Sequence, residues 1–357
     1  MEFKENAKYA IIVPTSMGVR ITPENRQPVY TSNTFFMQAT SAESNAISAS
    51  ASLGLKVKVL STFVKGSPIA KFIKSDLKKR NIEYEGPEIP QGGPWGYRHQ
   101  INIADSGFGV RAPYVHNDRA GEIGRELDVK DFDFKKIFIT DGVKLIHISG
   151  LVAALSEKSG EFCLKIAQEA KKHGTKISFD INYRASFWEN RKNELSTIFK
   201  KIASLANILI GNEEDFQLAL GIKGVEAGGS DLNKKINGFK DMIDNMQKEY
   251  PNVEIFSTTL REVLSANEHL WGAILKDQNE WHVVNPKSIP VLDRIGGGDG
   301  FVGGLLYGLL SNMKTEDAFH FGWANGALTT TLLTDYSSPI DEEQVWNIYK
   351  GNARVRR

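Results

Sequence analysis

Short runs of aliphatic and β-branched residues alternate with helical stretches along most of the chain. From about residue 42 onward, each apolar run is followed by a stretch with helical spacing. Such alternation is typical of βαβ units and of a mostly parallel sheet. We therefore predict an α/β fold with a doubly wound, mostly parallel sheet flanked by helices. The predicted strands are 9–13, 56–61, 144–149, 176–181, 207–211 and 253–258.

Several predicted helices carry end signals. Ser41 can cap the start of one helix, and Gly54 marks its end. Ser67 and Pro68 suit the N-cap and the first helical position of a second helix. A third helix is expected over 160–174, where a glycine ends it.

Two segments interrupt this rhythm. Residues 17–38 and 92–119 are rich in turn-forming residues and show alternating residues without a helical period. We interpret both as short antiparallel strands that pair into a small sheet over one edge of the core. This sheet is either a lid or a plain surface excursion. With the lid reading, the α/β core comprises 1–16, 39–91 and 120–357, and the lid comprises 17–38 and 92–119.

Composition excludes several classes of protein. The 44 Lys and Arg residues against 43 Asp and Glu residues give a formal charge of +1, which argues against a general nucleic-acid binder. The longest apolar runs fall short of the roughly 18 residues that a membrane span needs. Neither a membrane nor a nucleic-acid partner is expected. Cys163 is the single cysteine, which excludes an internal disulfide and favours a cytoplasmic location.

Familiar catalytic motifs are missing from the sequence. The dipeptide Gly-Lys never occurs, so the chain has no P-loop, and neither HExxH nor GxSxG is present. The first predicted strand runs into PTSMG rather than GxGxxG, which disfavours a classical dehydrogenase.

The segment 291–310, VLDRIGGGDGFVGGLLYGLL, carries the strongest chemical signal. Gly296, Gly297 and Gly298 precede Asp299 and an apolar helix. Glycine N–H groups at a helix start can bind an anion, and the helix dipole adds positive potential. A carboxylate beside a bound phosphate suits phosphoryl transfer to a hydroxyl. A glycine-rich turn whose Asp only complements the helix N-terminus is the alternative reading.

This segment closely resembles the C-terminal signature of the ribokinase-like (PfkB) carbohydrate kinases. Further matches follow the family in order and spacing, and the resemblance covers nearly the whole chain. Within the family, the sequence is most similar to the branch that phosphorylates 2-keto-3-deoxygluconate. The matching segments are DRIGGGDGFVGG, SFDINYRASFW (178–188), GNEED (211–215) and STTLREVLSANEHLWGAIL (257–275).

The resemblance implies roles for the signature residues. Asp299 matches the catalytic base, and the backbone of Gly296–Gly298 matches the anion hole. Asp293, the first residue of the signature, receives a supporting role. Gly300 stands where the family commonly has Ser or Ala.

The resemblance also implies a nucleotide and metal site for ATP and Mg²⁺. Asn212 and Asp215 occupy positions that organise Mg²⁺ and phosphates through water, although Asp215 replaces a longer Glu. Asn212 could instead be a helix N-cap. The positions expected to approach the nucleotide are Asn212, Thr258, Thr259, Leu260 and Asn325.

Two arginines are expected near the sugar. Arg184 follows the predicted strand 176–181, and ligands of open α/β folds bind at the carboxyl ends of strands. Its planar fork suits a carboxylate, whereas a structural ion pair is the alternative. By resemblance, Arg119 ends the lid-side segment of the acid-sugar kinases, and Tyr97 is a candidate lid contact. Two arginines favour an anionic sugar acid.

The early sugar-binding segment departs from the family pattern. Glu43 and Asn45 match, but Thr40 and Ser41 replace a glycine pair that lies close to the sugar in the family. The added side chains are expected to reshape the substrate site. Asp118 lies beside Arg119 and could neutralise part of its attraction for a carboxylate.

Together these features predict an ATP- and Mg²⁺-dependent kinase for 2-keto-3-deoxygluconate or a related sugar acid. A kinase for a neutral sugar or nucleoside, and a non-catalytic sugar-binding regulator on the same fold, remain the alternatives. The family also leaves open activation by a monovalent cation. Because lid strands expose edges that proteins usually cover, a homodimer through the lid is expected.

Overall fold

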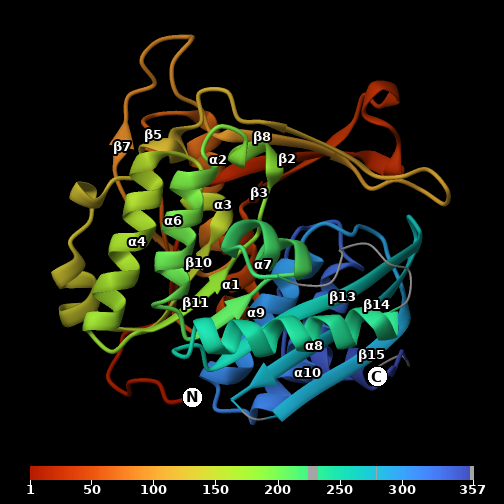
Figure 1. The fold of residues 1–357 in the computed structure, drawn as a ribbon. Coiled ribbons are helices and arrows are strands. Elements are labelled where there is room, and N and C mark those ends of the chain that lie inside the picture. Colours follow the sequence, from red (N-terminus) through yellow and green to blue (C-terminus); the bar gives the residue numbers. More distant parts are fainter. Residues whose placement is uncertain (224–231, 279, 354–357) are drawn as a thin grey trace. The chain divides into compact units, whose positions relative to one another are not determined.

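The computed structural model describes residues 1–223, 232–278 and 280–353 (Figure 1). These residues form two compact units, each assembled from separate parts of the chain. The first unit comprises Met1–Pro14, Arg125–Leu260 and Gly272–Pro286. The second comprises Thr15–Gly124, Arg261–Trp271 and Lys287–Arg357.

Parallel strands form the centre of the first unit. The strands β1, β10, β11, β12 and β13 pair in parallel, each with the next in that order. Beyond β13 the sheet continues to β14 and β15. The bounds are β1 (Tyr9–Pro14), β10 (Val143–Ser149), β11 (Lys176–Asp180), β12 (Ile208–Ile210), β13 (Ile255–Ser265), β14 (Glu268–Asp277) and β15 (Glu280–Pro290), the last three belonging partly to each unit.

Helices of the first unit connect these strands. Figure 1 shows α4 and α6 side by side along β10 and β11. The helix bounds are α3 (Gly150–Ala153), α4 (Glu157–Lys172), α5 (Ala185–Trp188), α6 (Lys192–Ala203), α7 (Glu213–Leu220) and α8 (Leu232–Glu249). Short helical turns are η3 (Ile123–Glu126), which begins in the second unit, η4 (Val129–Asp131) and η5 (Lys136–Asp141).

The start of α4 corrects the predicted helix over 160–174. Ser156 and Ser159 form a reciprocal capping box, so the helix begins three residues earlier than its glycine suggested. Phe162, Ile166 and Ala170 lie four residues apart and are fully buried. Their spacing places one apolar stripe of the helix against the core.

The second unit contains a four-stranded sheet within its described residues. Its order is β3, β2, β8, β9, and β3 and β9 are its outer strands. The bounds are β2 (Gly18–Pro23), β3 (Phe35–Thr40), β8 (Gln100–Asp105) and β9 (Tyr114–Asp118), with η1 (Glu24–Arg26) and η2 (Val29–Thr31) between β2 and β3. The predicted segments therefore do pair into a small sheet. They join through a parallel pair, β2 with β8, rather than an antiparallel one. A long connection, with further secondary structure of its own, allows that direction.

The second unit also contains five helices and four short strands among its described residues, and the glycine-rich segment forms the start of α9. Helices α9 and α10 pack closely, and α1 lies against α9. The helix bounds are α1 (Ala42–Ser52), α2 (Pro68–Lys79), α9 (Gly297–Leu310), α10 (Thr315–Thr329) and α11 (Glu342–Tyr349). The strand bounds are β4 (Val57–Leu60), β5 (Phe63–Val64), β6 (Ile82–Glu85) and β7 (Glu88–Ile89), with β4 paired to β6 and β5 to β7 in parallel.

Strand positions and two helix starts follow the sequence pattern. Each predicted strand coincides with an observed one, although β13 extends seven residues past the predicted end at 258. Ser41 and Ser67 are the N-caps of α1 and α2, as predicted. In the described part of the chain, none of the helices has both the length and the apolar character needed to span a membrane.

Candidate active site

The glycine-rich turn opens α9 and sets the position of Asp299. Gly296 is the N-cap in a left-handed conformation, with φ at 84°. A Cβ at this position would lie 1.9 Å from the Asp335 carbonyl oxygen, so only glycine fits. Gly298 is exposed, and a Cβ there would meet no atom within 4 Å. The turn is thus tightly packed at its first glycine and open at its third, with Asp299 in the first helical turn.

Close packing behind the turn explains the departure at Gly300. A Cβ at Gly300 would lie 2.3 Å from Thr329 Oγ1 and 3.1 Å from the Asn325 carbonyl oxygen. The serine or alanine common at this position would therefore collide with α10. A Cβ at Gly303 would lie 2.1 Å from the Ala46 carbonyl oxygen, which lets α1 approach α9 closely.

Asn45 contacts the predicted catalytic base directly. Its Nδ2 donates to Asp299 Oδ2 over 2.9 Å and to Thr40 Oγ1 over 3.2 Å. The Thr40 hydroxyl donates in turn to Asp335 Oδ2 over 2.8 Å. The structure therefore brings Thr40, Asn45 and Asp299 together, and it adds Asp335, which the sequence did not indicate.

Arg20 completes this network and also escaped the sequence analysis. Its side chain on β2 is 1% exposed and donates to both Asp293 and Asp335. Burial alone would lower the pKa of the guanidinium, but the two carboxylates outweigh burial and raise that pKa. Arg20 therefore stays charged. A single arginine inside an alternating strand carries no signal of such a role.

Ser41 and Glu43 make structural contacts near this network. The Ser41 hydroxyl accepts a hydrogen bond from the Ser44 N–H and so caps α1. Glu43 is buried, and its Oε2 accepts from Thr15 Oγ1 over 2.7 Å. The serine that replaces a family glycine thus starts a helix. Its expected contact with the sugar stays a prediction.

The surroundings of Arg119 differ from the expected ones. Asp118, predicted to neutralise it, instead pairs with Arg98. Arg119 Nη1 donates to both carboxylate oxygens of Glu122, at 2.7 and 2.9 Å, and Glu122 is 1% exposed. One nitrogen of the guanidinium, Nη1, is therefore engaged within the protein. Tyr97, in the segment before β8, is half-buried, and its N–H donates to the Gln91 carbonyl.

Asn212 and Asp215 form the start of α7 in the first unit. Asn212 Oδ1 accepts from the Asp215 N–H, and Asp215 Oδ2 accepts from the Asn212 N–H, each over 2.8 Å. Asp215 Oδ1 accepts from the Tyr183 N–H over 2.8 Å. Burial raises the pKa of the Asp215 carboxyl against the opposing effect of these bonds. The N-cap reading of Asn212 is confirmed, and the metal role of both residues remains a prediction.

Arg184 is exposed at the end of the loop after β11. It is the N-cap residue of α5, and its Nη1 donates to the Tyr183 carbonyl over 2.7 Å. This contact is to a backbone oxygen. The charge of Arg184 also offsets part of the rise in the pKa of the buried Asp215 carboxyl, so the predicted alternative of a structural ion pair stays open. A guanidinium in this position can still meet a carboxylate.

Besides Asn212, the predicted nucleotide-binding residues lie in two elements. Thr258, Thr259 and Leu260 lie on β13, where Thr258 and Leu260 are 3% exposed. Asn325 on α10 is fully buried, and its amide donates to the Gly300 carbonyl over 2.7 Å and accepts from Ser337 Oγ over 2.7 Å. In this structure Asn325 therefore joins α10 to the start of α9.

The comparison with known families decides the class of protein. A model of the pfkB family carbohydrate kinases matches residues 19–341. The chain belongs to this family. Members are kinases that use ATP and a divalent metal ion.

Individual relatives of this pfkB family kinase are sugar-acid kinases by name. It is 25% identical over 330 residues to a 5-dehydro-2-deoxygluconokinase of Clostridium perfringens, covering 92% of this chain and 89% of that protein. It is 24% identical over 341 residues to a 2-dehydro-3-deoxygalactonokinase of Haloferax volcanii, covering 95% and 96%. The structure of a 2-dehydro-3-deoxygluconokinase of Thermotoga maritima matches with a TM-score of 0.86 at 24% identity, covering 96% of this chain and 100% of that one. The fold is therefore ribokinase-like, as predicted.

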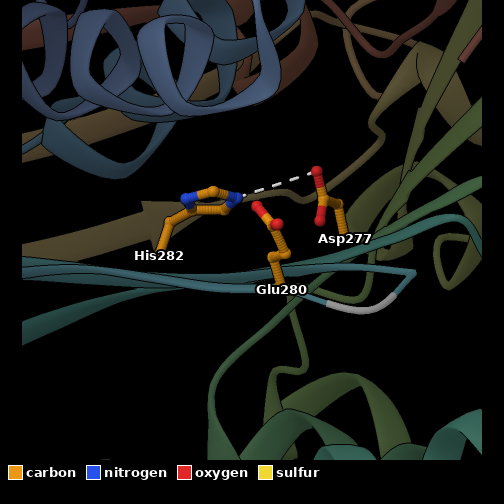
Figure 2. Close-up of side chains that lie close together, drawn as sticks. All are labelled: Asp277, Glu280 and His282. Atoms are coloured by element: carbon orange, nitrogen blue, oxygen red, sulfur yellow. Dashed lines mark ion pairs between the residues drawn. The ribbon is translucent and has the colours of Figure 1, made fainter.

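A further group of possible ligand atoms lies on the β14–β15 hairpin of the pfkB family kinase. Figure 2 shows Asp277, Glu280 and His282 with their side chains close together. His282 Nε2 lies 3.7 Å from Asp277 Oδ2, and Glu280 is exposed. Each could offer one atom to a metal ion. Charged side chains commonly cluster in this way on exposed hairpins, and the sequence analysis assigned them no role.

Proposed function

We propose that this kinase transfers the γ-phosphoryl group of ATP to a hydroxyl of a keto-deoxy sugar acid, with 2-keto-3-deoxygluconate as the first candidate. One observation carries the proposal. Asp299 follows the open glycine turn of α9 immediately, and Asn45 holds one of its carboxylate oxygens. A glycine turn that can bind an anion, beside an oriented carboxylate, suits phosphoryl transfer to a hydroxyl.

Asp299 acts as general base in the proposed reaction. The acceptor hydroxyl gives its proton to the Asp299 carboxylate as its oxygen bonds to the γ-phosphorus. The bond from the γ-phosphorus to the bridging oxygen breaks, and ADP leaves with that electron pair. Backbone N–H groups of Gly296–Gly298, at the N-terminus of α9, stabilise charge on the transferring group.

The acidic nature of the substrate is supported by Arg184 more than by Arg119. Arg184 is exposed and contacts a backbone carbonyl, whereas Arg119 is held by buried Glu122. We assign recognition of the sugar carboxylate to Arg184. The substrates in the names of these relatives are also six-carbon sugar acids, each with one keto and one deoxy carbon.

A second candidate is 5-dehydro-2-deoxygluconate, which is favoured by the names of several relatives. It has the same carboxylate and differs in the positions of the keto and deoxy carbons. A neutral sugar or nucleoside kinase and a non-catalytic regulator are the less favoured readings. Thr40 and Ser41, which replace a family glycine pair, keep the choice of sugar open to experiment.

We further propose that Mg²⁺ accompanies ATP. When bound, the cation neutralises charge on the phosphates. Asn212, exposed at the start of α7, would contact its water shell, while Asp215 orients Asn212 through the capping box. Thr258, Thr259, Leu260 and Asn325 remain proposed nucleotide positions, and a cytoplasmic location remains proposed from cysteine content.

The small sheet is proposed to act as a lid and to pair two copies of the chain. Its outer strands expose large apolar side chains: Phe35 and Phe36 on β3 are 38% and 39% exposed, and Tyr114 and Val115 on β9 are 62% and 40% exposed. Edge strands with such side chains are commonly covered by a partner. A dimer mass in light scattering is expected, and a monomer at micromolar concentration would contradict it.

An ATP-turnover assay with a panel of acceptors tests the function. The panel contains 2-keto-3-deoxygluconate, 5-dehydro-2-deoxygluconate, 2-keto-3-deoxygalactonate, gluconate, fructose, ribose and adenosine. Selective turnover of a keto-deoxy acid supports the proposal. Preference for a neutral acceptor would replace the substrate, and binding of a sugar without turnover would favour the regulator.

A further inference from the structure

Arg20 is an unusual feature of the second unit because it buries a full charge. Its side chain is 1% exposed and is among the largest fully buried side chains of the described residues. A buried guanidinium destabilises a protein unless opposite charges neutralise it and its N–H groups find hydrogen-bond acceptors. Here it lies between two buried carboxylates, Asp293 and Asp335, and donates to both.

The contact with Asp293 reaches the start of the glycine turn. Asp293 Oδ1 accepts from the Ile295 N–H over 3.0 Å, one residue before Gly296. Its Oδ2, which also meets Arg20, accepts from Ser106 Oγ over 2.6 Å. The conformation of the chain that enters the turn is therefore fixed by a carboxylate whose own position Arg20 holds.

The contact with Asp335 reaches the base along a second route. Asp335 Oδ2 accepts from Thr40, Thr40 Oγ1 accepts from Asn45, and Asn45 donates to Asp299. The Asp335 carbonyl also lies where a side chain at Gly296 would be. Asp335 thus supports both the turn and the hydrogen-bond partner of the base.

We propose that Arg20 is a positioning residue for phosphoryl transfer, because it holds Asp293 and Asp335 and through them fixes both the glycine turn and Asp299. The assignment rests on the proposed function and adds a residue outside the signature motif. One cation bound to two carboxylates sets the distance between them. Without it, two buried like charges repel, and the turn and the Thr40–Asn45 route lose a common anchor.

Substitutions at Arg20 distinguish the effect of its positive charge from the effect of its planar, two-armed shape. In Arg20→Met the charge is lost, and we expect kcat to fall by about 10- to 100-fold, as for a slight displacement of reacting groups. KM for ATP and for the sugar should change much less. Arg20→Lys keeps the charge without the planar fork and should give an intermediate kcat. Guanidinium ion, added well below its denaturing range, should restore part of the activity of Arg20→Met.

Arg191→Met is the matched control. Arg191 also makes several side-chain bonds, to Glu194 and to the Ala154 carbonyl, but it belongs to the first unit and lies outside the signature segment in sequence. Its loss should lower thermal stability without changing kcat of the folded enzyme. Amide hydrogen exchange over 293–301 should rise in Arg20→Met and stay at the wild-type level in Arg191→Met.

The outcomes distinguish a failure of the role assigned to Arg20 from a failure of the proposed function. A lower melting temperature with unchanged kcat, or unchanged exchange over 293–301, would show Arg20 to be only structural and overturn the inference. A wild-type protein without turnover on the acceptor panel would refute the proposed function instead. The exchange measurement then still decides whether Arg20 holds the turn, since it needs no activity. Because Arg20→Met can fold poorly, Arg20→Lys provides the same comparison in a charged variant.

Discussion

The Asn45 amide donates a hydrogen bond to Asp299 Oδ2 over 2.9 Å, between residues that are 254 positions apart in sequence. A donor on one carboxylate oxygen fixes the orientation of the group. The same Nδ2 also donates to Thr40, so the Asn45 side chain is itself held in place. The early segment of the chain therefore contributes to the site whose chemistry lies in the C-terminal signature.

Replacing the base should remove turnover while leaving ligand binding intact. Asp299→Asn keeps the shape of the side chain but removes its ability to take a proton, and kcat should fall by at least about 10²- to 10⁴-fold. ATP affinity, measured by calorimetry, should change little. Asp317→Asn, in the first turn of α10, is the matched control and should retain wild-type kcat. A fully active Asp299→Asn would exclude this residue as the base.

Substitution of Asn45 tests the hydrogen bond to the base. Asn45→Ala removes a bond to a charged group and should lower kcat by about 10-fold. Asn45→Asp should lower kcat further at neutral pH, because a second carboxylate beside Asp299 would share a proton with it. The rate of Asn45→Asp should recover as pH rises. Equal kcat of the wild type, Asn45→Ala and Asn45→Asp across the pH range would show that the contact between Asn45 and Asp299 has no catalytic role.

The two candidate sugar-binding arginines should respond differently. Arg184→Gln is expected to raise KM for the sugar acid by about 10-fold or more, with KM for ATP unchanged, because it loses a charged partner for the carboxylate. Arg119→Gln should affect stability more than KM, since buried Glu122 then loses the guanidinium nitrogen that donates to both of its carboxylate oxygens. Steady-state kinetics and thermal melts of both variants make the comparison. The reverse ranking would assign the carboxylate to Arg119.

Activation by a monovalent cation is not expected near the signature. The buried carboxylates Asp293 and Asp335 are a natural place for a cation, and the Arg20 guanidinium already lies between them. Replacing K⁺ by Na⁺ or by a tetraalkylammonium ion at constant ionic strength should therefore leave kcat nearly unchanged. Strong dependence on one of these ions would point to a cation site elsewhere.

His147 should make stability depend on pH. It is fully buried on β10, bonded to Ser178 Oγ, and burial lowers its pKa from 6.5 to about 4. Between these values the unfolded chain binds a proton that the folded protein excludes, so the contribution of neutral His147 is lost as pH falls from about 6.5 to 4. The loss should reach on the order of 3 kcal/mol near pH 4.

Denaturant unfolding at several pH values checks this expectation. His147→Asn should show a flatter dependence of unfolding free energy on pH between 4 and 6.5 than the wild type. His116→Asn, at an exposed position on β9, is the control and should keep the wild-type slope. An unchanged slope in His147→Asn would mean that other groups carry the pH dependence.

Local sequence patterns determined the elements of this protein. Apolar runs gave the strands because burial between layers of helices selects continuous hydrophobic residues, and Ser41 and Ser67 gave helix starts because their hydroxyls satisfy free N–H groups. The glycine turn with Asp299 was visible because its chemistry is contained in four consecutive residues. The predicted start of α4 was wrong because the helix was taken to begin at Gly160. The capping box of Ser156 and Ser159, in which each side chain accepts from the other residue's N–H, starts it at Glu157 instead.

Tertiary structure alone decided which distant residues meet. Arg20, Asp335 and Glu122 carry no local signal, because a buried charge is recognisable only from the partners that folding brings to it. For the same reason Asp118 was assigned to its sequence neighbour Arg119, whereas strand geometry gives it to Arg98. The prediction of antiparallel pairing was likewise wrong for β2 and β8, because the alternating pattern of one strand does not specify which strand lies beside it.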